Sequence, residues 1–115
     1  MVMRKNIREA FNCEMEKGIL LYSDNKLEAS FIHLERAHIL GQKYIWSHVK
    51  SHWWMLKIGY KHRSFREVFG QTTRIIASIL FSRIWVPLGN TGGTNVSAFK
   101  LMPIPEDLKK ILDEK

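Results

Sequence analysis

Residues 28–60 read EASFIHLERAHILGQKYIWSHVKSHWWMLKIGY, and this stretch decides the fold. At about 100° per residue its apolar positions form two helical stripes. We therefore predict consecutive amphipathic helices over residues 26–40 and 44–61, each with a histidine in the middle of its apolar stripe. The stripes contain Leu27, Phe31, Leu34 and His38 in the first helix and Ile45, Val49, His52 and Leu56 in the second.

The turns around this stretch carry helix-end signals. Gly41 has the position of a C′ residue, where the left-handed conformation costs glycine nothing. Asn25 with Glu28, and Ser64 with Glu67, have the spacing of capping boxes that open helices. These signals predict short connections between antiparallel helices.

Working outward, the pattern predicts a helix over residues 3–22, with Glu14 inside its apolar stripe. A helix over residues 65–83 is expected to bury a stripe of large apolar side chains. Residues 87–96 read as a Gly-rich loop, residues 102–105 as extended chain and residues 106–114 as a short helix. The expected core stripe of the fourth helix is Phe65, Val68, Phe69, Ile76, Ile79 and Leu80.

The predicted fold class is therefore all-α: four antiparallel helices in two hairpins, as a bundle or as stacked hairpins, closed by a Gly/Pro-rich loop and a short C-terminal helix. The 115 residues, 45% apolar and 25% charged, are expected to form one domain, residues 1–115. A single cysteine, Cys13, excludes an intramolecular disulfide and fits a reducing cytoplasm. We expect no signal peptide and no membrane partner, because no apolar run is long enough to span a bilayer.

The formal charge of +7 raises the question of an acidic partner. Basic side chains concentrate locally at Lys57, Lys61, Arg63 and Arg66, beside His62. The cluster is a candidate phosphate or acidic-partner site, but a solvated corner between helices is the preferred interpretation. A nucleic-acid partner is not expected, although the charge alone allows one.

Five acidic and histidine side chains are expected to converge between three helices. If neighbouring helices are antiparallel, Glu14 lies level with Glu35, and His38 with His48, while His52 lies one turn further along. Glu-x-x-His and His-x-x-x-His spacings project both side chains from one helix face and suit a divalent transition metal such as zinc, iron, nickel or copper. The predicted metal site comprises Glu14, Glu35, His38, His48 and His52.

Other interpretations stay open beside the metal site. The same side chains could form a buried hydrogen-bonded network that fixes helix register, or a catalytic group without metal. The glycines of residues 89–93 could bind an anion, although a loop that covers the bundle is preferred. No Ser-His-Asp order or Cys-His pair stands out, so catalytic activity is not expected. His33 is placed at the edge of its stripe, and His62 has no site role.

Two resemblances accompany these patterns. LERAHILGQ at residues 34–42, the His48-x-x-x-His52 pair and GNTGGTNV at residues 89–96 together resemble a small bacterial family of unknown function, over residues 10–108. The helices also resemble a tetratricopeptide pair: Ser30, Leu34 and Ala37 have its second-helix spacing, and Trp53-x-x-Leu56-x-x-x-Tyr60 its first-helix spacing. This second resemblance implies stacked hairpins and an alternative function as a protein-interaction or self-association module. The tryptophans that extend beyond one stripe, Trp54 among them, favour such an interface.

Overall fold

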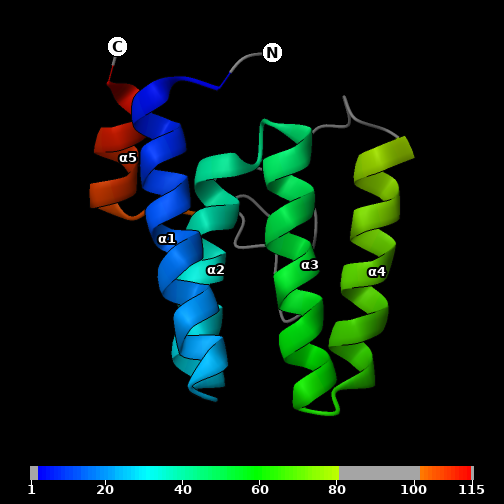
Figure 1. The fold of residues 1–115 in the computed structure, drawn as a ribbon. Helices are drawn as coiled ribbons and strands as arrows, with labels where there is room; N and C mark the ends of the chain where they lie inside the picture. Colours follow the sequence, from blue (N-terminus) through cyan, green and yellow to red (C-terminus); the bar gives the residue numbers. More distant parts are fainter. Residues whose placement is uncertain (1–2, 81–101, 115) are drawn as a thin grey trace.

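The structure is a computed structural model that describes residues 3–80 and 102–114, except for the side chains of Ser78 and Leu80. These residues form five helices and no strand, which confirms the predicted all-α class (Figure 1). The helices are α1 (Lys5–Ser23), α2 (Leu27–Gly41), α3 (Ile45–Lys61), α4 (Phe65–Leu80) and α5 (Glu106–Asp113).

The first four helices form two antiparallel hairpins. α1 packs on α2, α3 packs on α4, and α2 joins the hairpins by packing on α3 (Figure 1). α5 lies against α1 and α2, so the C-terminal helix closes the first hairpin rather than the second. No described helix is long and apolar enough to cross a membrane.

The core lies between α1, α2 and α3, with one contribution from α5. The buried face of α1 is the one predicted, including Glu14 among apolar neighbours. α2 is buried along most of its second half, because α1, α3 and α5 all pack against it. The main core cluster is Phe11, Met15, Leu34, Ala37, Ile39, Leu40, Met55, Ile58 and Leu108.

α5 is attached by apolar and polar contacts. Leu108 is 1% exposed within the main core, and the side-chain amide of Asn6 on α1 donates to the carbonyl of Ile111 at 3.1 Å. The Arg4 guanidinium also donates to the carbonyls of Leu112 and Glu114. The start of α1 therefore binds the last turn of α5.

Two predicted helix ends differ in the structure. Gly41 is the last residue of α2 rather than a left-handed C′ residue, and Gln42 follows with φ −64°. Gly41 is needed for space instead, because an added Cβ would lie 2.8 Å from Cβ of Ser47 and 2.9 Å from Cε2 of Phe11. Asn25 forms no capping box with Glu28; its φ is 60°, and no side chain caps α2. Asn25 tolerates this left-handed conformation better than most residues do.

The predicted orientation of α4 is wrong. Phe65, Phe69, Ile76 and Ile79 were expected in the core but are exposed, whereas Gln71 is completely buried. α3 meets α4 along the face that carries Gln71 and Glu67. Half of the second capping box is present, since the Glu67 amide donates to Ser64 Oγ at 3.3 Å while the Glu67 carboxylate binds Gln71.

Several predictions lie outside the described residues. These are the end of the fourth helix at residues 81–83, the Gly-rich loop at residues 87–96 and the covering role of the segment that follows it.

Candidate metal centre

Three histidines from two helices meet in the interior. His38 comes from α2, and His48 and His52 lie one turn apart on α3. Their ring centroids are 4.7–4.8 Å apart in all three pairs. A potential ligand nitrogen from each ring lies within 4.8 Å of the other two. Both hairpins therefore contribute to one imidazole cluster.

The ring of His52 is oriented by α4. Its Nδ1 contacts Oε1 of Gln71, which can only accept a hydrogen bond, so Nδ1 carries the proton and Nε2 keeps its lone pair. Nε2 of His52 lies 2.9 Å from Nε2 of His48. Nε2 of His52 is therefore the acceptor of a hydrogen bond from Nε2–H of His48, and its lone pair points into the cluster.

Gln71 is itself held in place. Its amide nitrogen donates to Oε1 of Glu67 at 2.7 Å and lies 3.5 Å from the Met55 sulfur. Gly59 permits this arrangement, because an added Cβ there would lie 2.8 Å from Cβ of Glu67. The Glu67 carboxylate therefore holds the Gln71 amide, which in turn orients the His52 ring. Metal-binding histidines are commonly oriented by such hydrogen-bonded partners.

Burial keeps these imidazoles neutral. His38 and His52 are each 2% exposed, and His48 is partly buried. Burial, together with the nearby positive charge of Arg74, lowers the pKa of His48 to about 4. Burial also lowers the pKa of His52 to about 3, and His48 and Arg74 lower it too, whereas the hydrogen bond that His52 donates to Gln71 raises it. Neutral imidazole is the form that binds a metal ion.

The spacing of the nitrogens is compatible with a metal. Nitrogens at about 2.0–2.1 Å from a tetrahedral zinc lie roughly 3.4 Å from one another. His48 and His52 are near this spacing, and a donor pair at the 4.8 Å limit would close to it by a movement of about 1.5 Å. Three histidines would leave the fourth position of a tetrahedral site open.

Glu14 lies elsewhere, in an ion-pair network between α1, α2 and α5. Arg36 Nε donates to its two carboxylate oxygens at 2.9 and 3.1 Å, and His33 Nδ1 lies 3.2 Å from Oε2. The Arg36 guanidinium also binds Asp107 on α5, and this hydrogen bond lowers the pKa of the Asp107 carboxyl. Glu35 is partly buried, and neither Glu14 nor Glu35 belongs to the group of donors that lie together.

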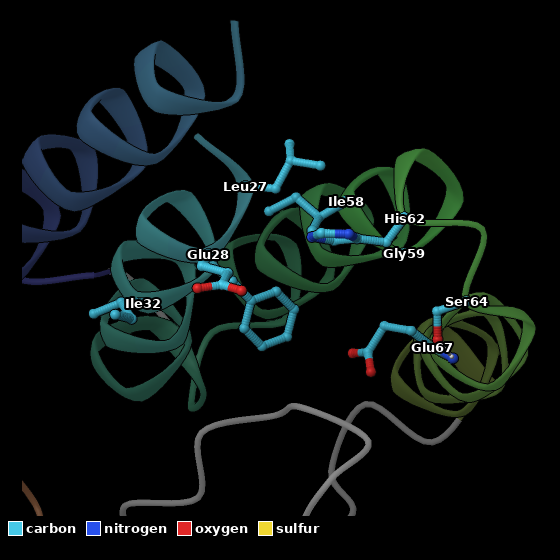
Figure 2. A pocket seen from close by; sticks show the side chains of 9 residues that line it. Leu27, Glu28, Ile32, Ile58, Gly59, His62, Ser64 and Glu67 are labelled. Atoms are coloured by element: carbon cyan, nitrogen blue, oxygen red, sulfur yellow. Dashed lines mark hydrogen bonds between the residues drawn. The ribbon is translucent and has the colours of Figure 1, made fainter. Parts of the chain in front are cut away.

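An open pocket of about 370 Å³ lies between α2 and the α3–α4 turn, and none of the three clustered histidines lines it. Phe31 and Ile58 are among its apolar lining residues, and Glu28 of α2 and Glu67 of α4 reach it from opposite sides (Figure 2). Because Glu67 also binds Gln71, the pocket borders the outer partners of the histidine cluster.

The sequence reasoning missed Arg36, Gln71 and Glu67. Arg36 lies three residues from His33 and was available as a counter-ion for a buried Glu14. Gln71 was overlooked because the apolar stripe of its helix was assumed to face inward. A glutamine and a glutamate four residues apart, beside an interior histidine, were the signal for this polar face.

A search of curated proteins and a search of solved structures each found no significant match to the chain. A family profile matches residues 5–112, and this agrees with the family of unknown function that the sequence motifs resemble. Because this match covers nearly the whole length, the chain belongs to the family described as Protein of unknown function (DUF3703).

Proposed function

We propose that this protein binds a divalent transition metal through His38, His48 and His52. The observation that carries the proposal is the convergence of three interior imidazoles, one of them oriented by Gln71. Each of the three rings lies against the two other imidazoles. Neutral imidazoles can bind a cation, although the nearby positive charge of Arg74 opposes its binding.

The donor set favours metals that bind imidazole, namely zinc, copper, nickel and iron. The grouped donors include no carboxylate or thiolate, which disfavours magnesium and calcium. Glu14 and Glu35 were proposed as ligands on the sequence; in the arrangement proposed now, Glu14 serves the α1–α2–α5 network instead. We propose a reducing cytoplasm as the setting, since Cys13 is unpaired and exposed, and we assign no catalytic role.

The proposal is tested first by elemental analysis of protein purified without an affinity tag, followed by titration with zinc, nickel and copper. We expect one metal per chain with a dissociation constant below about 1 µM, or roughly −8 kcal/mol. Replacing His48 by Gln should weaken binding at least tenfold, whereas replacing the exposed His62 by Gln should not.

Thermal melts provide a second readout. Metal at about 1,000 times its dissociation constant should stabilise the fold by about 4 kcal/mol, and a chelator should reverse the effect. If native protein contains no metal and its melting temperature ignores both metal and chelator, the cluster is a buried structural network.

The alternative, a tetratricopeptide-like protein-interaction or self-association module, stays a prediction. It rested on the tetratricopeptide-like spacing and on tryptophans that extend beyond one stripe. Trp46 and Trp53 are exposed, whereas Trp54 packs edge-on against Tyr22 with ring centroids 5.4 Å apart and lies under the Lys57 ammonium. Trp54 therefore joins α3 to α1 instead of offering a binding surface.

A further inference from the structure

The α3–α4 hairpin carries large apolar side chains on its outer surface. On α3, Trp46, Trp53 and Tyr60 repeat every seven residues, so they form a single stripe. On α4, Phe65, Phe69, Ile76 and Ile79 fall within about a quarter-turn of one another. All seven side chains are between 49% and 85% exposed. We call these seven residues the outer face.

Both stripes lie on the same side of the hairpin. His52 contacts Gln71, so these two residues mark where the helices meet. On a helical wheel of α3, the stripe lies about 100° from His52, measured in the direction in which residue numbers increase. On a helical wheel of α4, measured in the same way, the stripe lies about 120° from Gln71. Because the helices are antiparallel, these similar rotations lead to one side. The histidine cluster and α2 lie on the other side.

The hairpin that carries this face is basic. α3 and α4 contain five Lys and Arg residues, namely Lys50, Lys57, Lys61, Arg66 and Arg74, and one acid, Glu67. Glu67 binds Gln71 and lines the pocket toward α2, so its carboxylate belongs to the opposite side of the hairpin. Lys57 lies beside the outer face, with its ammonium 5.8 Å from the centre of the Trp53 ring.

We infer that the outer face docks on an anionic lipid bilayer surface. Trp, Tyr and Phe with aliphatic side chains on one face, flanked by lysines with long stems, are what an interfacial helix presents to headgroups and acyl chains. That none of the described helices could span a membrane is no obstacle, since a surface-bound helix lies in the plane of the interface. The expectation of no membrane partner rested only on the lack of an apolar run long enough to cross a bilayer, which does not address binding to the bilayer surface.

The charge and the apolar side chains of the outer face favour a bilayer over a second copy of the chain or a nucleic acid. A second copy would bring two basic hairpins together, with no exposed acid among the described residues of α3 and α4 to pair with the lysines. Single-stranded nucleic acid would match the charge and the aromatic rings, but Ile76 and Ile79 offer no stacking surface. An anionic bilayer satisfies both the aliphatic and the basic parts of the surface.

The test is co-sedimentation of the full chain with vesicles of phosphatidylcholine alone or mixed with phosphatidylglycerol. We expect binding to the anionic vesicles only, with a loss of at least tenfold at about 1 M salt, where screening acts within about 3 Å. The double variant Phe65→Ser, Phe69→Ser should lose at least tenfold in partitioning. Leu20→Ser, which removes an exposed apolar side chain from α1, is the matched control and should bind like wild type.

Circular dichroism checks that the variants fold, and Tyr60→Ser provides a second variant on α3. The proposal is overturned if wild type does not bind anionic vesicles, or if folded outer-face variants bind as well as wild type. It is also overturned if wild type ignores vesicles and light scattering shows a dimer that Phe65→Ser, Phe69→Ser converts to a monomer. Tight binding of a single-stranded oligonucleotide without vesicle binding would overturn it in favour of nucleic acid. Because the face lies opposite the histidines, His48→Gln should leave vesicle binding unchanged.

Discussion

At the scale of single residues, Gln71 is the side chain on which the proposed metal centre depends most. Replacing Gln71 by Leu would leave the buried Nδ1–H of His52 without its acceptor. We expect a loss of about 1–3 kcal/mol in the free energy of unfolding and a 10–100-fold loss in zinc affinity. Urea unfolding and zinc titration measure the two effects. Thr72→Ala, at the exposed neighbouring position, should change neither, and a Gln71 variant with normal zinc affinity would contradict the assigned role.

Glu14 gives the opposite expectation. Replacing Glu14 by Leu should destabilise the fold by about 1–3 kcal/mol, because Arg36 loses one partner but keeps Asp107. Zinc affinity should be unchanged, since Glu14 serves the contact between α1, α2 and α5. A zinc affinity reduced as strongly as in His48→Gln would place Glu14 among the metal ligands after all.

The histidines could be placed from sequence, but the partners of Glu14 could not. Helical spacing put His38 on an apolar stripe and His48 and His52 on one face, and a short turn made the two helices antiparallel. The partner of a buried carboxylate depends on the side-chain conformation of a long arginine and on the docking of α5, some seventy residues away along the chain. Neither is encoded in local periodicity.

At the scale of helices, α4 shows where periodicity fails. Its apolar stripe predicted a helix correctly but identified the wrong face as the buried one. The hydrophobic rule assumes that the apolar face seeks the core, whereas α3 presents histidines to α4 and takes Gln71 in return. A helix that packs through its polar face can be recognised only when the polar partner on the neighbouring helix is known.

Gly59 sets the distance between α3 and α4. In Gly59→Ala, the new methyl group would lie 2.8 Å from Cβ of Glu67 and 3.3 Å from the backbone nitrogen of Val68. We expect a net loss of about 1–2 kcal/mol, because the overpacking exceeds the gain of about 1 kcal/mol in helix propensity. Denaturant unfolding measures it. A stabilised variant would mean that the helices separate without strain.

At the scale of the whole molecule, the buried histidines should make stability depend on pH. The folded pKa values of about 4 for His48 and about 3 for His52 lie below the ordinary value of 6.5. Between these values the unfolded chain binds more protons than the folded one, so stability falls as pH falls. Each group should contribute a slope of about 1.4 kcal/mol per pH unit from about pH 6 down to its folded pKa, about 4 for His48 and about 3 for His52.

Urea unfolding of metal-free protein from pH 8 to pH 4 measures this slope. In His48→Gln the slope should decrease by about 1.4 kcal/mol per pH unit, the contribution of one histidine. In His62→Gln the slope should stay unchanged. Equal slopes in wild type and His48→Gln would show that His48 titrates normally in the folded protein.

The position of the histidines across the joint between hairpins has a kinetic consequence. The α1–α2 and α3–α4 contacts join neighbours along the chain, so each hairpin can form early by short loop closure. His48 and His52 then stand together before His38 arrives, and docking of the hairpins, reported by the Tyr22–Trp54 contact, completes the cluster. Metal release should therefore require the two hairpins to separate again. Its rate should follow the opening of this joint, measured by hydrogen exchange along α2, rather than global unfolding.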